Sequence, residues 1–234
     1  MFGVYIHFPF CASRCGYCDF ATTAAAEIPH RRYADVVLAE LLARSEAYRG
    51  HGPAGPVYVG GGTPSLWDAA QLARVLGAAL EPGVGGSVQE VTLEANPGDV
   101  RAASLDGWRR AGVNRLSIGL QSLDDRCLRL LGRRHDARQA RRAVALARRH
   151  GFASLSCDVM FALPGQTVAH HLAQLSAVLE LAPDHVSVYS LSLSPRSPLG
   201  RGGLRPGADA VTLEMMERGR DLLHSAGLRQ YEVS

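Results

Sequence analysis

The feature that most constrains the fold is a regular alternation of short and long segments with hydrophobic patterning. The short segments are apolar or β-branched and are predicted strands: Val4–His7, Val57–Val59, Glu90–Ala95, Arg115–Gly119, Ser154–Phe161 and His185–Leu191. The longer segments are predicted helices: approximately Arg31–Tyr48, Ala69–Leu80, Ala102–Arg110, Ala137–His150, Val168–Leu181 and Ala208–Ala226. This alternation indicates βαβ units and an α/β fold with parallel strands. Six such units fit a partial (β/α)6 barrel better than a closed barrel of eight units.

One sizeable core is expected because the chain has 234 residues, of which 47% are hydrophobic. This length suits one large domain as well as two small ones, and we expect the core domain to span residues 1–234. No segment approaches the roughly 18 unbroken apolar residues of a membrane span. The short apolar start before Pro9 is not typical of a signal peptide. These features predict a cytoplasmic protein, and the small net charge of +3 gives no indication of a nucleic-acid partner.

All 25 basic residues are arginine, and many of them lie between residues 126 and 149. Within Ala137–His150, Ala140, Val144 and Ala147 recur on one helical face, and arginines dominate the rest of the segment. The arginines can therefore form a solvated helix face or, alternatively, a surface for an anionic ligand or partner.

The first predicted strand leads into a C-x3-C-x2-C motif formed by Cys11, Cys15 and Cys18. Three thiolates on one short loop can each bind a different iron of a cubane cluster, which leaves the fourth iron without a protein ligand. An open position on a metal centre is where a small molecule can bind and react. The total of five cysteines is odd, so a metal in a reducing compartment explains them better than a set of disulfides.

A zinc site and three merely structural cysteines are the alternatives for this motif. Structural zinc usually has four ligands in two separated pairs, whereas Cys127 and Cys157 are isolated in this sequence. Tyr17 and Phe20, which flank the third motif cysteine, are apolar enough to shield a cluster from water and oxygen.

Ligands of parallel α/β folds bind at the carboxyl ends of the strands. Gly60-Gly61-Gly62-Thr63 follows the second predicted strand, and its glycines allow a ligand to approach the backbone closely, although a plain turn would also contain glycine. Glu94 ends the third strand, where a carboxylate could bind ribose hydroxyls or an ammonium group, or simply lie on the surface.

Two further polar residues lie on later strands. Gln121 follows the fourth strand at its carboxyl end, whereas Arg115 begins that strand and is interpreted as structural. Asp158 lies inside the apolar fifth strand, which is costly unless the carboxylate faces a polar interior or a partner. Arg133 or Arg134 could supply that partner.

The cysteine motif and the glycine segment resemble those of the radical S-adenosylmethionine superfamily. The whole chain resembles its subgroup of oxygen-independent coproporphyrinogen III oxidases and HemW-type haem chaperones, through the segments YIHFPFCASRCGYCDF, GGGTPS, LEANP, GVNRLSIGLQS, LGRRHD, DVMFALPGQT, HVSVYSLSL and QYEVS. The resemblance implies a [4Fe–4S] cluster on Cys11, Cys15 and Cys18, with S-adenosylmethionine chelating the fourth iron. It also implies an electron donor, because the reduced cluster cleaves the sulfonium and releases a deoxyadenosyl radical.

The resemblance also assigns cofactor contacts by position. These fall on the following residues of this sequence: Tyr5, Gly61, Gly62, Thr63, Glu94, Gln121, Arg133 and Asp158. Tyr17 lies within the cysteine motif and is expected to line the same cofactor site.

One departure separates the two branches of the subgroup. The oxidases continue their cysteine motif with a further cysteine two residues on, where this chain has Phe20, as the chaperone branch does. The resemblance therefore implies a haem chaperone that binds haem and passes it to an acceptor protein. The alternative is an enzyme, a coproporphyrinogen III dehydrogenase that oxidatively decarboxylates propionate side chains. A smaller departure is Ala162, where the subgroup usually has glycine.

The source of a haem contact is less defined by the sequence. Members of the subgroup continue into a C-terminal domain that carries a His-Asn-x-x-Tyr-Trp motif, which the sequence of 234 residues does not contain. Within the barrel, His7, His135, His170 and His171 are possible axial ligands, and the arginines near Arg133 could attract haem propionates. Solvated or core histidines are the commoner alternative.

Replacing any one of Cys11, Cys15 or Cys18 by alanine is expected to abolish cluster assembly, because each thiolate holds a separate iron. Anaerobic reconstitution followed by iron and sulfide analysis measures this. Cys127→Ala and Cys157→Ala are the matched controls and should assemble a full cluster. A fully loaded cluster in Cys15→Ala would contradict the ligand assignment.

Overall fold

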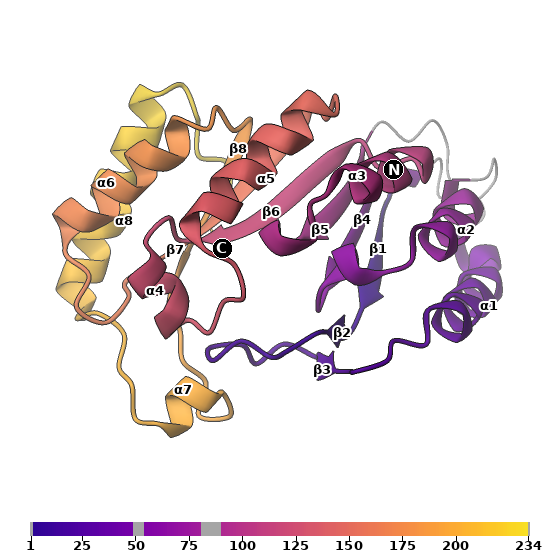
Figure 1. The fold of residues 1–234 in the computed structure, drawn as a ribbon, viewed down its shortest axis with the longest axis horizontal. Helices are drawn as coiled ribbons and strands as arrows, with labels where there is room; N and C mark the ends of the chain where they lie inside the picture. The colour runs from indigo at the N-terminus through magenta and orange to yellow at the C-terminus, as the bar shows by residue number, and fades with distance from the viewer. Residues whose placement is uncertain (1, 49–53, 81–89, 234) are drawn as a thin grey trace.

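The computed structural model describes residues 2–48, 54–80 and 90–233, so Met1 and Ser234, the ends of the expected 1–234 domain, lie outside the described residues. Six strands form one parallel sheet (Figure 1): β1 (Phe2–Phe8), β4 (Ala54–Gly61), β5 (Val91–Ala95), β6 (Arg115–Gln121), β7 (Ser154–Phe161) and β8 (His185–Ser190). Their order in the sheet is their order in the chain. Within the described residues, β1 and β8 each pair on one side only, so the sheet is open and the predicted partial barrel is confirmed.

Helices connect the strands and cover the sheet (Figure 1). The main helices are α1 (His30–Tyr48), α2 (Ala69–Leu80), α3 (Ala102–Arg110), α5 (Ala137–Arg149), α6 (Val168–Leu179) and α8 (Asp209–Ser225). α1 packs on α2 at one end of the molecule, and α6 packs on α8 at the other. All six correspond to predicted helices, with ends that differ by at most a few residues.

Several short elements were not predicted from the sequence. They are β2 (Phe10–Cys11), β3 (Thr23–Ala24), α4 (Asp125–Leu130), α7 (Pro198–Arg201) and the 3-10 turns Pro64–Leu66 and Pro97–Asp99. β2 and β3 pair with each other and bracket the cysteine loop. Segments this short contain too few residues to show a hydrophobic period, which explains why they were missed.

Local signals explain where α5 begins and which face it buries. Asp136 is its N-cap, because the Asp136 side chain accepts a hydrogen bond from the Gln139 amide at 2.7 Å. In return, the Gln139 side-chain oxygen accepts one from the Asp136 amide at 3.0 Å, which completes a capping box. The predicted face of Ala140, Val144 and Ala147 is buried. The arginines of this helix are mostly exposed, as a solvated face requires.

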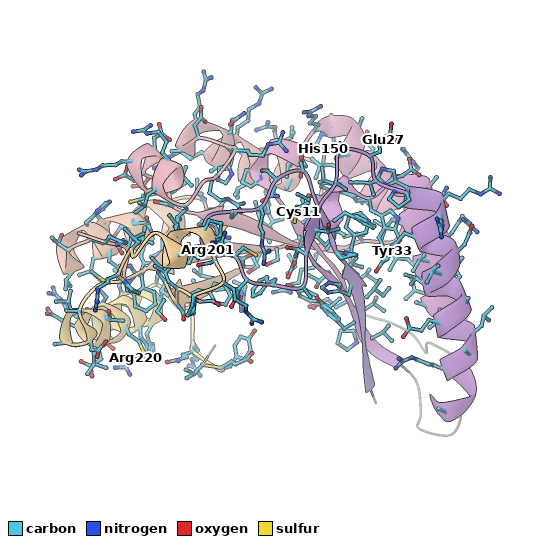
Figure 2. The ribbon with its side chains drawn as sticks, turned by 90° about the horizontal axis from the view of Figure 1, so that it is seen from below. Cys11, Glu27, Tyr33, His150, Arg201 and Arg220 are labelled. Atoms are coloured by element: carbon cyan, nitrogen blue, oxygen red, sulfur yellow. The ribbon has the colours of Figure 1, made fainter. Side chains whose placement is uncertain are left out.

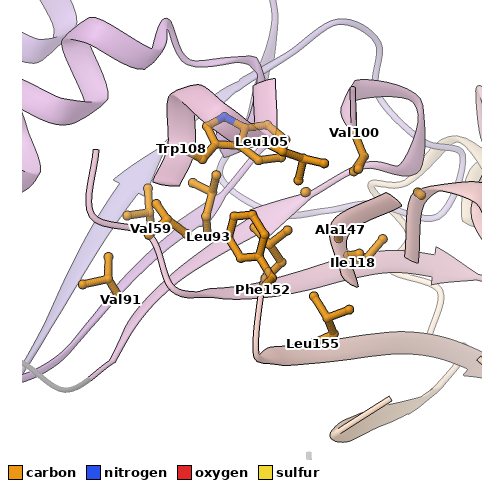
Figure 3. Packing of buried hydrophobic residues seen from close by; sticks show 14 of the residues in the cluster. Val59, Val91, Leu93, Val100, Leu105, Trp108, Ile118, Ala147, Phe152 and Leu155 are labelled. Atoms are coloured by element: carbon orange, nitrogen blue, oxygen red, sulfur yellow. The ribbon is translucent and has the colours of Figure 1, made fainter. Parts of the chain in front are cut away.

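The main core lies between the sheet and its helices (Figure 3). Leu93, Ile118 and Leu155 from neighbouring strands are fully buried, and Trp108 of α3 and Phe152 pack against this layer. Both are among the largest fully buried side chains of the described residues, so each removes a large apolar area from water.

In the part of the chain that the structure describes, no helix combines the length and apolar character that crossing a membrane requires.

Leu93→Ala is expected to lower the free energy of unfolding by about 2–5 kcal/mol, because the fully buried side chain leaves a cavity in the centre of the sheet. Leu213→Ala is the matched control, since Leu213 of α8 is 56% exposed, and it should change the free energy by less than about 0.5 kcal/mol. Urea unfolding followed by circular dichroism measures both. Equal losses in the two variants would contradict the assignment of the core.

Candidate functional site

The cysteine loop begins at the carboxyl end of β1 and is fixed there by backbone hydrogen bonds to the next strand. The Gly62 amide donates to the Phe8 carbonyl at 2.7 Å, and the Thr63 amide donates to the Phe10 carbonyl at 2.9 Å. Figure 2 shows Cys11 between the end of the molecule that carries Tyr33 and the end that carries Arg220. The loop therefore lies over the middle of the sheet, where the carboxyl ends of the strands meet.

The far side of the loop is held by two other segments. The Gly16 amide donates to the Leu131 carbonyl after α4 at 3.2 Å, and the Gly16 carbonyl accepts from the Leu199 amide of α7 at 2.8 Å. A Cβ atom on Gly16 would lie 2.9 Å from the Leu199 side chain. Glycine is therefore required by close packing between the second and third motif cysteines.

The three cysteines of the loop lie near one another but are not arranged around a single ion. Burial and the neighbouring Cys18 and Cys15 thiols raise the pKa of the Cys11 thiol. Thiolates on one tetrahedral zinc lie about 3.8 Å apart. In the structure, the three Sγ atoms of the loop do not all lie within 4.8 Å of one another. Such spacing suits ligands of separate irons rather than ligands of one zinc.

Arg133 links this loop to the ends of two strands. Its Nη1 donates to Cys15 Sγ at 3.4 Å, and its Nη2 donates to the Gly119 carbonyl at 3.0 Å and to the Asn96 side chain. Its Nε is buried and has no partner in the structure. A buried donor without a partner is costly, so the guanidinium is placed to bind a further acceptor beside Cys15.

Tyr17 lies against the same guanidinium. Burial raises the pKa of the Tyr17 hydroxyl to about 12, partly opposed by the nearby Arg133. The ring packs on a small apolar cluster formed with Leu131, Met160 and Leu191. The Tyr17 ring therefore lies between Arg133 and this apolar cluster.

The glycine segment at the end of β4 contacts the start of the cysteine loop. Gly61 has a φ of +121°, which favours glycine, and a Cβ atom there would lie 2.7 Å from the His7 ring. A Cβ atom on Gly62 would lie 2.7 Å from the Pro9 carbonyl. The segment is therefore more than a plain turn, because it brings two backbones into direct contact at the site.

Glu94 is half-buried rather than on the surface. Its Oε1 accepts from the Tyr58 hydroxyl at 2.9 Å, and its Oε2 accepts from the Gly61 amide at 3.1 Å. Burial raises its pKa. Tyr5 stacks on Tyr58, and its hydroxyl lies 3.2 Å from Nδ1 of His7. These contacts place the predicted residues Tyr5, Gly61 and Glu94 in one group.

Asp158 has a different partner from the one expected. The Ser117 hydroxyl lies within hydrogen-bonding distance of both carboxylate oxygens, at 2.9 and 3.1 Å, whereas Arg133 binds Cys15, Asn96 and Gly119. The expectation that Arg133 or Arg134 pairs with Asp158 is therefore wrong. Burial raises the pKa of Asp158, since hydroxyl groups compensate less for desolvation than a guanidinium would.

The remaining predicted residues lie at the same edge of the sheet. Gln121 ends β6 with a φ of +61°. Its side chain packs over Gly119, because a Cβ atom built on Gly119 would lie 3.0 Å from Gln121 Nε2 and 3.5 Å from Arg133 Nη2. Thr63 is buried, and its hydroxyl accepts from Asn96 Nδ2 at 3.4 Å. Sequence reasoning placed Asn96 just after the third predicted strand but assigned it no contact. It missed Tyr58 and Ser117, which lie inside β4 and β6 rather than after a strand.

The candidate haem-ligating histidines of the barrel are engaged or buried. His135 is buried, its Nε2 donates to the Leu120 carbonyl at 3.1 Å, and burial lowers its pKa to about 4. His171 is fully buried against Phe161. His7 Nε2 donates to the Ala21 carbonyl at 2.9 Å, and His170 pairs with Asp124. Core and surface roles, the alternative in the sequence analysis, describe these side chains better.

A cavity of about 500 Å³ lies beyond the carboxyl ends of β7 and β8. Its lining includes Ala162 and Ser190 at these strand ends and Gly200 of α7. Arg196, Arg201 and Arg205 are exposed on the same segment. The cavity is therefore bounded by the segment that carries these arginines, although the charged residue in its lining is Asp209.

Fold and site together define a partial α/β barrel with a cysteine-lined site at the carboxyl ends of its strands. The family described as the radical SAM superfamily matches residues 5–175, and the chain belongs to this superfamily, whose fold implies a [4Fe–4S] cluster and S-adenosylmethionine.

The most similar proteins support the same subgroup. The chain is 38% identical over 233 residues to the haem chaperone HemW of Escherichia coli and covers 61% of that protein with 99% of its own length. It is 41% identical over 237 residues to the mitochondrial radical S-adenosyl methionine domain-containing protein 1 of Bos taurus, covering 53% of that protein with 99% of its own length. The chain thus spans between half and two thirds of the length of these relatives.

The solved structure of coproporphyrinogen III oxidase (HemN) from Escherichia coli is also similar. It superimposes with a TM-score of 0.82 at 26% sequence identity, over 97% of this chain and 53% of that chain. The fold class predicted from the sequence is therefore confirmed by an experimental structure.

The stability of the protein without bound ligand is expected to fall as the pH rises above 3.8, the ordinary pKa of an aspartate. The pKa of Asp158 is raised in the folded state, so its stabilising contribution is complete below the ordinary value and is lost as the pH passes the raised value. In Asp158→Asn the free energy of unfolding should decrease less with rising pH, because the amide oxygen can still accept from Ser117 and carries no charge. Urea unfolding across the acidic range measures it, with the exposed Asp106→Asn as control; identical profiles for the parent and Asp158→Asn would contradict the assignment.

Proposed function

We propose that Cys11, Cys15 and Cys18 hold the [4Fe–4S] cluster of this chain, within a core domain that spans residues 1–234. The proposal is supported by the loop geometry, in which the thiols are near one another but not grouped around one ion. It is further supported by Arg133, whose Nη1 donates to Cys15 Sγ and whose buried Nε has no hydrogen-bond partner. A cation beside a thiolate-bound cluster stabilises its negative charge.

S-adenosylmethionine would occupy the space between the cysteine loop and the ends of β4, β5 and β6. The backbone of Gly61 and Gly62, with Thr63, would line the methionine part, and the Glu94 carboxylate would accept from its ammonium group or ribose hydroxyls. Tyr5, Gln121 and Asp158 would face the remaining parts of S-adenosylmethionine. Tyr17 and Arg133 would border the cluster. Once bound, the cluster and S-adenosylmethionine supply one-electron chemistry from a reduced state.

The residues of this chain contribute binding, orientation and protection from water. Tyr58 and the Gly61 amide hold both oxygens of Glu94, so the carboxylate is oriented before a ligand binds. Burial favours its protonated form, and a cationic ligand would reverse that effect. Tyr17 and the apolar cluster beneath it exclude water from one side of the loop.

The function that the site supports best is that of a HemW-type haem chaperone, which holds haem and passes it to an acceptor protein. The observation that carries this choice is Phe20, which is 67% exposed where the oxidase branch has a further cysteine. Similarity to HemW over 99% of the chain supports it. Five free cysteines and an oxygen-sensitive cluster suit the reducing cytoplasm, where an electron donor for the cluster is also required.

The second candidate is a coproporphyrinogen III dehydrogenase, an enzyme that decarboxylates propionate side chains. It is favoured by the similarity to HemN. The exposed Arg196, Arg201 and Arg205 lie on the segment that bounds the cavity, and guanidinium groups bind carboxylates in two-point geometry. Both functions involve a porphyrin, so a porphyrin ligand is common to the two proposals.

Residues 1–234 alone are expected to bind haem more weakly than the same residues fused to the part of Escherichia coli HemW that lies beyond the matched region. The reason is that His135 and His171 are buried and His170 is paired with Asp124, so the barrel offers no free axial ligand among these three. A haem titration of both forms, followed by the Soret band, measures the difference. Equal affinity would place the haem site in the barrel and would contradict this part of the proposal.

The choice between the two functions is tested separately on the reconstituted protein, in both forms. Anaerobic incubation with coproporphyrinogen III, S-adenosylmethionine and a reductant should give no decarboxylated porphyrinogen. A catalytic yield of product would overturn the chaperone proposal in favour of the enzyme. The Cys15→Ala variant is the control for reactions that do not depend on the cluster.

A further inference from the structure

A second group of ligand-type side chains lies outside the cysteine loop, where α4 and α6 begin. Asp124, Cys127 and His170 each present one ligand atom, and the three atoms lie within 4.8 Å of one another. Over residues 2–48, 54–80 and 90–233, no other set of histidine, cysteine or carboxylate side chains meets this condition.

Helix capping orients two of the three side chains. Asp124 is the N-cap of α4, and its Oδ1 accepts from the Arg126 amide at 2.7 Å, which leaves Oδ2 at 3.2 Å from His170 Nε2. His170 lies in the first turn of α6, where its amide donates to the N-cap Thr167 hydroxyl at 3.1 Å. Both side chains therefore project from fixed positions at the starts of their helices.

A buried network fixes the distance between the two helices. The Asp124 amide donates to the Ser122 hydroxyl at 3.1 Å, and that hydroxyl donates to Gln174 Oε1 of α6 at 2.6 Å. Gln174 Nε2 donates in turn to the Met160 carbonyl at 3.0 Å. Ser122 and Gln174 are both buried, so this network is protected from competing water. The three ligand atoms are thus preorganised by supporting hydrogen bonds, as in metal sites.

We propose that Asp124, Cys127 and His170 form a binding site for a zinc-type divalent transition metal, with the fourth position open to water. Carboxylate oxygen, thiolate sulfur and imidazole nitrogen are all zinc ligands, and such atoms lie about 3.3–3.8 Å apart on one tetrahedral ion. The separation of 3.2 Å between Asp124 Oδ2 and His170 Nε2 is close to that value. Cys127 closes the inner side, because it is only 9% exposed.

The ion would enter from solvent, since the side chains of His170 and Asp124 are 38% and 37% exposed. Its binding displaces the thiol proton of Cys127 to water, so that a thiolate–metal bond forms without any change of oxidation state. The site lies next to the cysteine loop. Cys127 packs in the apolar cluster that contacts Tyr17, and the Leu131 carbonyl at the end of α4 anchors Gly16. A bound metal would link α4 to α6 and would thereby stabilise the hydrogen bond between the Leu131 carbonyl and the Gly16 amide.

The test uses the full chain with Cys11, Cys15 and Cys18 replaced by serine, so that the loop cannot bind metal. Zinc alone and cobalt alone, the latter as a spectroscopic substitute, are titrated into this parent. We expect one equivalent of zinc to bind and one equivalent of cobalt to give a thiolate-to-cobalt charge-transfer band. Zinc should also raise the midpoint of thermal unfolding of the parent.

Cys127→Ala and His170→Gln should each weaken zinc binding by more than the roughly 10–100-fold that loss of an outer partner costs. The matched controls are Cys157→Ala and His150→Gln. His150 also pairs with an aspartate, Asp106, at 3.1 Å, but it does not belong to the group of three ligand-type side chains. Both controls should bind as the parent does. His170→Gln changes a surface side chain, so it tests the site even where Cys127→Ala fails to fold. Absence of the charge-transfer band, or equal affinity in the parent and His170→Gln, would overturn the proposal.

Discussion

The site depends first on the direct contact between two backbones, the end of β1 and the glycine segment at the end of β4. The amides of Gly62 and Thr63 bind carbonyls on either side of Pro9, so the start of the cysteine loop is held in register with the neighbouring strand. A side chain on Gly61 or Gly62 would separate the two segments. Because Glu94 accepts from the Gly61 amide, the same contact also positions the carboxylate at the end of β5. Three strand ends are thereby fixed by a few hydrogen bonds between residues far apart in the sequence.

Charged groups at this edge of the sheet are incompletely compensated by their neighbours among the described residues. Glu94 and Asp158 are held by hydroxyl and amide groups without a cationic partner at bonding distance, and burial raises the pKa of both. Arg133 retains a buried Nε donor without an acceptor. Each of these features costs free energy when no ligand is bound. A zwitterionic ligand such as S-adenosylmethionine carries the complementary charges, and its binding would relieve these costs.

The sequence was sufficient for the parallel sheet, its six strands and the main helices, because each has enough residues to show its hydrophobic period. It also identified the residues at the strand ends, since position after a strand is a property of the chain itself. The pairing of those residues could not be predicted in the same way. Arg133 was expected near Asp158 on the basis of charge, but the strand register places Ser117 beside Asp158, and Arg133 reaches Cys15 and Asn96 instead. The roles of Tyr58 and Asn96 likewise depend on contacts across the sheet that no local pattern reveals.

Gly16 occupies an unusual position, because its amide and its carbonyl are bound by segments that follow two different strands. The segment that binds its carbonyl includes α7, and α7 also forms part of the wall of the cavity beyond β8. A molecule that displaces this wall must therefore alter the hydrogen bond to Gly16, and with it the backbone between Cys15 and Cys18. Binding of such a molecule in the cavity and the arrangement of the thiols would then be thermodynamically coupled, and by reciprocity a change at the thiols would alter its affinity.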